Sequence, residues 1–259
     1  MAFNIVIPTI NDEEQDFDCL FRLWQRANSI CTKETYSEVI FDFSKCKFLR
    51  QNAVAFIGGL ARFIEDHNID LILDETTLPC KIKENLHKNC FLQFFGNGRD
   101  SHQGNSIPYR EDQDENKDKN AIVSYLSEEW LGKGHVAVSQ ELQNAIVSTT
   151  WEIYANAFEH SQTNIGVFSC GQYYPRLCEL KLTVVDFGVG IPHNVRNFLD
   201  QDDIPADQAL EWAFEIGHTT RQGKITGGIG LDSLKSFVKN NKGKLEIFSH
   251  EGYIIVDEC

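Results

Sequence analysis

The chain has 259 residues, of which 42% are hydrophobic and 24% are charged, a composition that suits one large or two ordinary globular domains. Its formal net charge of −14 argues against a protein that coats nucleic acid through phosphate neutralisation, although a local basic pocket for a small anion is compatible with it. No basic segment precedes an apolar run at the N-terminus, and no stretch approaches the roughly 20 apolar residues of a membrane-spanning helix, so neither a signal peptide nor a membrane segment is expected.

The cysteines indicate a cytoplasmic protein. None belongs to a C-x-x-C pair or to another zinc-binding spacing, and the chain is too long for a small domain held together by disulfides. We therefore expect reduced, mostly buried thiols. The eight cysteines are Cys19, Cys31, Cys46, Cys80, Cys90, Cys170, Cys178 and Cys259.

The first hundred residues alternate strand and helix patterns. Short β-branched and aromatic runs predict strands at 3–8, 37–44 and 69–74, and apolar residues at helical spacing predict helices at 16–30 and 52–68. Strands that alternate with helices are typical of an α/β layer built around one sheet.

Residues 96–120 differ sharply in composition from the segments on either side. Gly, Asn, Asp and Ser dominate, and Asp112, Asp114, Glu115 and Asp118 form an acidic run. Such a segment is typical of an exposed, charged linker, and we predict a domain boundary there.

Two helices are predicted after this segment, at 121–131 and at 139–161. Ser139 suits the N-cap of the longer helix, with Leu142 three residues later. The apolar side of that helix is expected to run through Leu142, Ile146, Thr149, Ile153 and Ala157.

A polar stripe follows one side of this long helix near its end. Glu152, Asn156 and His160 recur at every fourth residue, and a step of four residues advances only about 40° beyond a full turn. A solvated helix face is the simpler interpretation. The stripe borders the apolar side rather than lying opposite it, however, and the wall of a ligand pocket is expected at such a border.

A strand at 180–186 is predicted to end in an aspartate followed by glycines. Asp186 at the tip of this strand could accept a hydrogen bond from an exocyclic amine such as that of adenine. Gly188 and Gly190 permit close approach of the backbone to a ligand. A tight strand-to-loop turn without a ligand fits the same residues equally well.

Further along, a glycine-rich turn leads into an amphipathic helix that begins near Leu231. Free N–H groups at such a helix start suit phosphates, and Arg221 and Lys224 could add charge-assisted contacts. The P-loop pattern fails here, because five residues rather than four separate its glycines and Ile225 stands where that pattern needs Ser or Thr.

Together, these three segments resemble the GHKL superfamily, the ATP-binding fold shared by gyrase and the histidine kinases. Residues 152–160 resemble its N box, "DFGVGI" at 186–191 its first glycine motif, and "GIGL" at 228–231 its second. The motifs occur in the order that the family shows, each in its expected helix or strand setting. The resemblance covers about residues 120–259.

The resemblance implies a two-layer α/β sandwich of the Bergerat type, with helices on one face of a mixed sheet and ATP between these helices and a flexible lid at 217–227. It implies that Asn156 ligates Mg²⁺, that Asp186 reads adenine, and that Glu152 activates the attacking water or hydroxyl group. His160 is not expected to be catalytic, because such a residue more often caps a helix or bonds locally. The implied nucleotide-binding positions are Asn156, Asp186, Gly188, Gly190, Ile191, Thr219, Thr220, Arg221, Lys224, Gly228, Gly230 and Leu231.

The first hundred residues also resemble, more faintly, the STAS fold of anti-sigma-factor antagonists. The matching stretch is residues 38–63, a strand, a loop and a helix. Where that family often offers a serine for phosphorylation, this chain has Arg50, Gln51 and Asn52, none of which carries a hydroxyl group. An interaction domain is therefore expected rather than a phosphoacceptor.

We expect a STAS-like α/β domain at 1–95, an acidic linker at 96–120 and a GHKL-type ATP-binding domain at 121–259. The first functional hypothesis is an Mg-ATP-dependent switch or slow ATPase that controls a protein partner. The second is a protein kinase of the anti-sigma-factor (serine) or histidine kinase type, and Glu152 favours its serine branch. The third is a degenerate nucleotide-binding module without turnover. After the predicted strands at 244–249 and 253–258 we expect no transducer domain of the kind that supplies a catalytic lysine in gyrase-like members, and therefore no fast hydrolysis. The identity of the partner and a homodimeric state stay open.

Overall fold

The computed structural model describes residues 1–33, 35–96, 104–113, 118–215 and 231–257. The predicted lid, 217–227, lies outside these residues, as does the second glycine motif except Leu231. The chain is a mixed α/β protein, as its class prediction states, and forms two compact units. Unit 1 consists of Met1–Asp118, Ser124–Ala137 and Asn164–Phe187. Unit 2 consists of Lys119–Val123, Val138–Thr163 and Gly188–Cys259.

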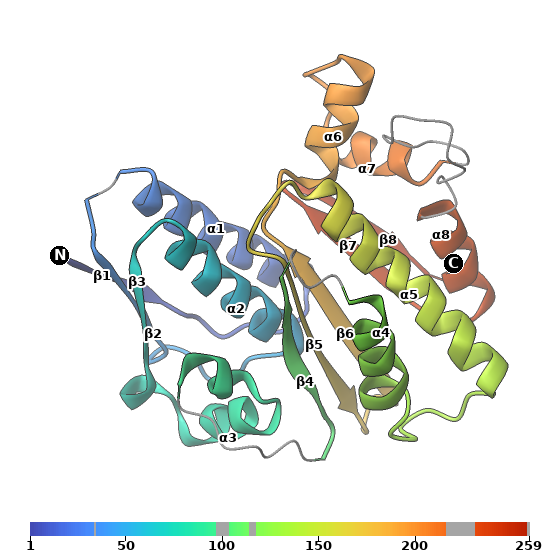
Figure 1. The fold of residues 1–259 in the computed structure, drawn as a ribbon, viewed down its shortest axis with the longest axis horizontal. Coiled ribbons are helices and arrows are strands. Elements are labelled where there is room, and N and C mark those ends of the chain that lie inside the picture. Colours follow the sequence, from blue (N-terminus) through green and yellow to red (C-terminus); the bar gives the residue numbers. More distant parts are fainter. Residues whose placement is uncertain (34, 97–103, 114–117, 216–230, 258–259) are drawn as a thin grey trace. The chain divides into compact units, whose positions relative to one another are not determined.

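Figure 1 labels the elements in chain order. The strands are β1 (Ala2–Val6), β2 (Glu38–Asp42), β3 (Asp70–Asp74), β4 (Ser106–Asp112), β5 (Val167–Tyr174), β6 (Glu179–Asp186), β7 (Leu245–Ser249) and β8 (Gly252–Val256). The α-helices are α1 (Glu14–Cys31), α2 (Gln51–Asp66), α3 (Cys80–Lys88), α4 (Lys119–Ser124), α5 (Gln140–His160), α6 (Gly190–Leu199), α7 (Ala206–Ala213) and α8 (Leu231–Asn240). Short helices of other types are η1 (Glu75–Thr77), η2 (Phe91–Phe95) and the π-helix η4 (Tyr125–Trp130).

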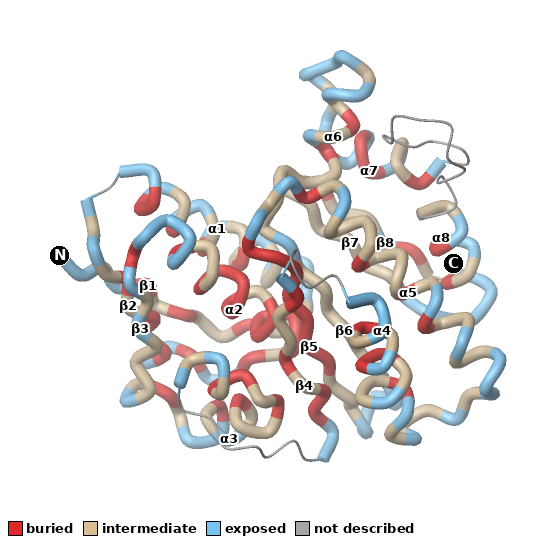
Figure 2. The backbone as a smooth tube through the Cα atoms, viewed as in Figure 1, coloured by how far each residue is buried: buried red, intermediate tan, exposed pale blue. Residues whose placement is uncertain are grey.

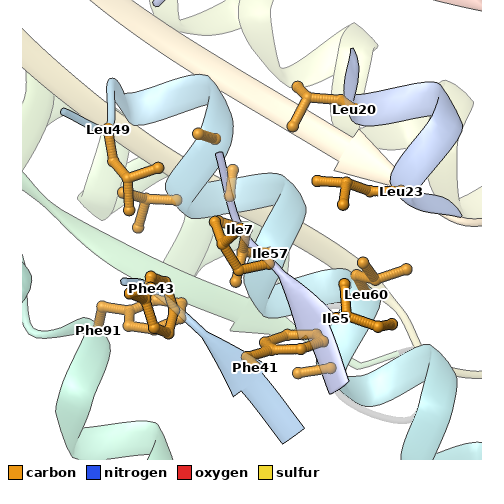
Figure 3. Close-up of a cluster of buried hydrophobic side chains, with 14 of the residues drawn as sticks. Ile5, Ile7, Leu20, Leu23, Phe41, Phe43, Leu49, Ile57, Leu60 and Phe91 are labelled. Carbon is orange, nitrogen blue, oxygen red and sulfur yellow. The ribbon is translucent and has the colours of Figure 1, made fainter. Parts of the chain in front are cut away.

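In unit 1 the first three strands form a parallel sheet in the order β1-β2-β3. Successive side chains of a strand point to opposite faces, so Ile5, Val39 and Phe41 share one face, and all three are fully buried. Leu60 of α2 and Leu23 of α1 belong to the same core cluster, which Figure 3 draws around Ile5 and Phe41. Helices α1 and α2 therefore cover this face of the sheet.

Helix α2 is the central element of unit 1. Eleven of its sixteen residues are buried, and much of it is red in Figure 2. A helix that is apolar on all sides needs neighbours on all sides. Helix α2 packs against α1 and β3, and also against β5 and β6.

The strands β4, β5 and β6 form a second, antiparallel sheet of unit 1. Phe168 and Cys170 of β5 belong to the same hydrophobic core as the first sheet, and Phe187 after β6 packs against it. In this respect the compact units differ from the predicted domains 1–95 and 121–259, because both segments contribute to unit 1.

The prediction of an exposed linker at 96–120 was wrong for residues 106–112, which form β4. Its charged side chains are paired rather than solvated. Asp112 is buried and accepts hydrogen bonds of 2.9 and 2.7 Å from Arg110 Nε, and Glu111 accepts bonds of 3.1 and 2.9 Å from Arg62 Nε of α2. Composition alone did not reveal these partners.

Unit 2 contains the antiparallel pair β7-β8 and the helices α5 to α8. Leu234 and Val238 of α8 form a small core with Phe214 and Val256, and Ile153 of α5 packs against it. Ile153 lies on the predicted apolar side of α5. The buried residues of α5 are instead Val147, Thr150 and Tyr154, which lie on a neighbouring side of the helix.

Most strongly patterned elements are confirmed. Six strands (β1, β2, β3, β6, β7 and β8) and four helices (α1, α2, α5 and α8) lie where the sequence predicts them. The predicted helix at 121–131 is α4 followed by the π-helix η4. The sequence analysis did not predict α3, β4, β5, α6 or α7. None of the helices in the described residues is long and apolar enough to cross a membrane.

The prediction of mostly buried thiols holds only in part. Of the seven cysteines in the described residues, all free, Cys31, Cys46 and Cys170 are buried, whereas Cys80 and Cys178 are exposed. Burial raises the pKa of the Cys46 thiol to about 11, so this thiol stays protonated at neutral pH.

Gly59 of α2 lets the helix approach the second sheet closely. A Cβ atom there would overlap the Phe187 ring and lie 2.6 Å from Cδ2 of Phe168. We expect Gly59→Ala to lower the free energy of unfolding by about 1–2 kcal/mol, because overpacking outweighs the helix propensity gained. Urea unfolding measures this change. Gly243→Ala is the matched control, since its nearest neighbour would be at 3.6 Å; a Gly59→Ala chain as stable as the parent would contradict the packing.

Candidate functional site

Helix α5 carries the predicted polar stripe. It begins at Ser139, whose Oγ accepts a hydrogen bond of 3.2 Å from the backbone N–H of Leu142, as the sequence predicts. Glu141 in its first turn and His160 in its last turn match the helix dipole. Glu152 and Asn156 are four residues apart on this helix and therefore lie about one turn apart.

Glu152 and Asn156 are partly buried and have no partner within the described part of the chain. Neither side chain makes a hydrogen bond or an ion pair there. Residues four apart on a helix have Cβ atoms about 5–6 Å apart, so one small ligand can contact both side chains. The polar atoms of both side chains are not buried, so a ligand arriving from solvent can reach them.

The first glycine motif lies at the C-terminal end of α5. The backbone N–H of Val189 donates a hydrogen bond of 2.8 Å to Ser161 O, and Asn194 Nδ2 donates one of 2.9 Å to His160 O. The last carbonyls of a helix have no partner within the helix, and the loop supplies donors for two of them. A Cβ atom on Gly188 would overlap the backbone of Ser161, so only glycine permits this approach.

The turn between β7 and β8 holds the same loop from another side. Ser249 Oγ accepts a hydrogen bond of 3.0 Å from the N–H of Ile191, in the first turn of α6, and so acts as a cap supplied by a distant strand. His250 Nε2 lies 2.7 Å from Val189 O, which requires the proton on Nε2. Gly190 has a φ of +76°, and a Cβ atom there would lie 2.5 Å from the His250 ring.

Helix α8, which follows the second glycine motif, packs beside α5. Leu231, the last residue of that motif, contacts the same small core as Ile153. The predicted site residues that belong to unit 2 and to the described residues are Glu152, Asn156, Gly188, Gly190, Ile191 and Leu231. Those that lie outside the described residues are Thr219, Thr220, Arg221, Lys224, Gly228 and Gly230.

Asp186 is the last residue of β6 and belongs to unit 1. It is exposed, and strand alternation places its side chain on the face of β6 opposite to Val185, which packs against the core of unit 1. The chain passes from Asp186 to Gly188 through Phe187 alone, and the Phe187 ring packs on Phe56. Asp186 stays the predicted adenine ligand.

At the place where the STAS resemblance would put a phosphoacceptor, the loop is tied to the surrounding side chains. Arg50 is the N-cap residue of α2, and its guanidinium lies 2.8 Å from Asp12. Lys181 of β6 lies 2.5 Å from the other oxygen of Asp12. Burial alone would lower the pKa of Lys181, but the hydrogen bond and charge of Asp12 outweigh it and raise that pKa.

The two residues after Arg50 are also engaged. Gln51 and Asn52 are buried, and Gln51 Oε1 accepts a hydrogen bond of 2.7 Å from Tyr174 Oη. Asn52 Nδ2 donates one of 2.9 Å to Asn11 O. None of Arg50, Gln51 and Asn52 carries a hydroxyl group, so these three residues offer no group for phosphorylation.

Three residues that organise the site were missed by sequence reasoning: Asn194, Ser249 and His250. Each holds a group that is distant in sequence, up to 61 residues away, so no local pattern reveals it. In the part of the chain that the structure describes, no group of three or more His, Cys, Asp or Glu side chains gathers to bind a metal ion. A magnesium ion held by one amide and by phosphate oxygens needs no such group.

Comparison of the chain with protein-family models, with curated proteins and with solved structures finds no match.

Replacing Ser249 tests the cap across the loop. We expect Ser249→Ala to accelerate hydrogen exchange of the Ile191 amide about fivefold, because the loss of one hydrogen bond costs about 1 kcal/mol. Exchange mass spectrometry or NMR measures it. Ser236→Ala, an exposed serine of α8 in the same unit, is the control. Equal exchange of Ile191 in both variants would show that Ser249 does not hold the loop.

Proposed function

We propose that this chain is an Mg-ATP-dependent switch or slow ATPase of the GHKL type that controls a protein partner. The observation that carries the proposal is a pair of partly buried side chains on α5, Glu152 and Asn156. Neither has a partner among the described residues, and the end of the same helix is bonded to the first glycine loop. The order of the three sequence motifs supports the same assignment.

The side chains present fit magnesium-bound triphosphate. The amide oxygen of Asn156 is a hard ligand that Mg²⁺ accepts together with phosphate oxygens and water, and it lacks another partner within the described residues. Bound magnesium would neutralise charge on the phosphates. Asp186 would accept a hydrogen bond from the adenine amine, which is a donor only.

Glu152 is the proposed general base. Its carboxylate lies one turn from Asn156 and can take the proton of the attacking water or hydroxyl group. Without a base at this position, binding and release of ATP would still bias the partner-binding state, but turnover would be slow. The same carboxylate serves a serine kinase, which is the second candidate; a module that binds nucleotide without turnover is the third.

A titration with ATP tests binding and the metal role together. We expect the affinity of the parent for ATP to rise with Mg²⁺ and that of Asn156→Ala to lose this dependence. Asp186→Asn is expected to keep it but to bind about 10- to 100-fold more weakly, because a hydrogen bond to a charged group is worth about 1.5–3 kcal/mol. Asn240→Ala of α8 is the control. A parent that binds no ATP, or an Asp186→Asn chain with parental affinity, would contradict these assignments.

Turnover separates the three candidates. We expect Glu152→Gln to keep ATP affinity and to lower phosphate release about 100-fold or more, which is the usual contribution of a general base. Glu141→Gln on the same helix serves as the control. With γ-labelled ATP and the partner present, label found on the partner establishes a kinase, and tight binding with no release or transfer in the parent leaves the passive module. Equal rates in both variants would remove Glu152 from the mechanism.

A further inference from the structure

Within unit 1, helices α1 and α2 cover one face of the parallel sheet β1-β2-β3. The other, here called the open face, is covered by no helix among the residues of unit 1 that the structure describes (Figure 1). On the open face Ile40 and Ile72 lie opposite each other in register, and Ile72 is 43% exposed. Parallel sheets in folded proteins almost always have both faces covered, usually by helices. The open face therefore lacks the layer that such a sheet normally carries.

Carboxylates flank these two isoleucines at both ends. Strand pairing places Glu38 opposite Asp70 and Asp42 opposite Asp74. Among the described residues, none of the four forms a salt bridge. Hydrogen bonds from Ser44 lower the pKa of Asp42, with a smaller contribution from the charge of Lys45, so this carboxylate is ionised at neutral pH.

We propose that this acidic sheet face, formed by Ile40 and Ile72 between the two carboxylate pairs, binds a basic amphipathic helix of a partner protein. This proposal rests on the proposed function in one point only: it identifies the kind of protein partner that the switch would control. A helix is the element that covers parallel sheets, and its apolar side would pack on the isoleucines. Its Lys or Arg residues would meet the carboxylates.

The sheet also sets the spacing of those basic residues. The two carboxylate rows are four residues apart along the strands, which is about 13 Å at 3.3 Å per residue. A helix rises 1.5 Å per residue, so charges at positions i and i+7 or i+8 span about 11–12 Å. Apolar residues at i+3 and i+4 would then face Ile40 and Ile72.

A second copy of this chain is a poorer occupant. Its net charge of −14 would repel an already acidic face. An interaction with a basic helix gains from the same charges, and its affinity would fall as salt screens them.

The test measures peptide binding to the full chain in the absence of nucleotide. A negative result would therefore contradict the acidic-face proposal without bearing on whether the chain binds ATP. The probe is a blocked, alanine- and glutamine-based helical peptide with Arg at i and i+7 and Leu at i+3 and i+4. A peptide of the same composition with the two Arg residues on opposite sides is its control. The variant Glu38→Lys/Asp70→Lys reverses one carboxylate row, and Asp202→Lys/Asp203→Lys makes the same charge change on exposed residues of unit 2.

We expect the patterned peptide to bind the parent and the control variant equally, and the Glu38→Lys/Asp70→Lys chain at least tenfold more weakly. Amide protection on binding should be confined to β2 and β3, and Ile72→Ser should weaken binding without changing the charge. Circular dichroism and urea unfolding verify that each variant folds. No binding, equal binding of the scrambled peptide, equal loss in both charge variants, or a parent dimer that itself protects β3 would overturn the proposal.

Discussion

The arrangement of the candidate site depends on the hydrogen bonds that tie the first glycine loop to the end of α5. Val189 donates to Ser161 O and Asn194 to His160 O, so the carbonyl groups that end the helix are bonded by the loop itself. The loop is held on its other side by Ser249 and His250. Because donors and acceptors on both sides are used, the backbone of residues 188–191 has a fixed position relative to the helix that carries Glu152 and Asn156.

A different constraint organises unit 1. One side of helix α2 packs against the parallel sheet and α1, and another side packs against β5 and β6. Glycine residues at two of its central positions make room for aromatic rings. The partly buried pair of Arg62 and Glu111 adds a bond between α2 and β4, with Tyr109 Oη donating to the same carboxylate at 2.9 Å. The N-terminal segment and the second sheet therefore share one core.

Sequence patterns predicted the elements whose hydrophobic period is strong. Helices α1 and α2 and the β-branched strands of the first sheet are of this kind. In α5, whose hydrophobic period is weaker, the N-cap at Ser139 is confirmed. Strand β4 could not be predicted in this way, since its sequence contains a proline and three consecutive charged residues, and its burial comes from partners elsewhere in the chain. Helices α6 and α7 were missed, although α8, which has the same length as α6, was predicted; a proline stands at the start of each missed helix, Pro192 in the first turn of α6 and Pro205 at the N-cap of α7.

The same distinction applies to the candidate site. The stripe on α5 and the glycines after β6 are local patterns, and within unit 2 the glycine loop is bonded to the end of the helix that carries Glu152 and Asn156. Asn194, Ser249 and His250 hold that arrangement through contacts that only the folded chain creates. The burial of α5 was also misjudged, because its buried residues, including Tyr154, lie beside the predicted side rather than on it.

A crystal structure of the chain with Mg²⁺ and a non-hydrolysable ATP analogue tests the central claim most directly. We expect the metal to contact the Asn156 side chain and the phosphates, with the adenine amine on Asp186 and the backbone of Gly188 to Gly190 lining the nucleotide. Nucleotide bound elsewhere, or Asn156 and Asp186 facing separate surfaces with no shared ligand, would contradict it.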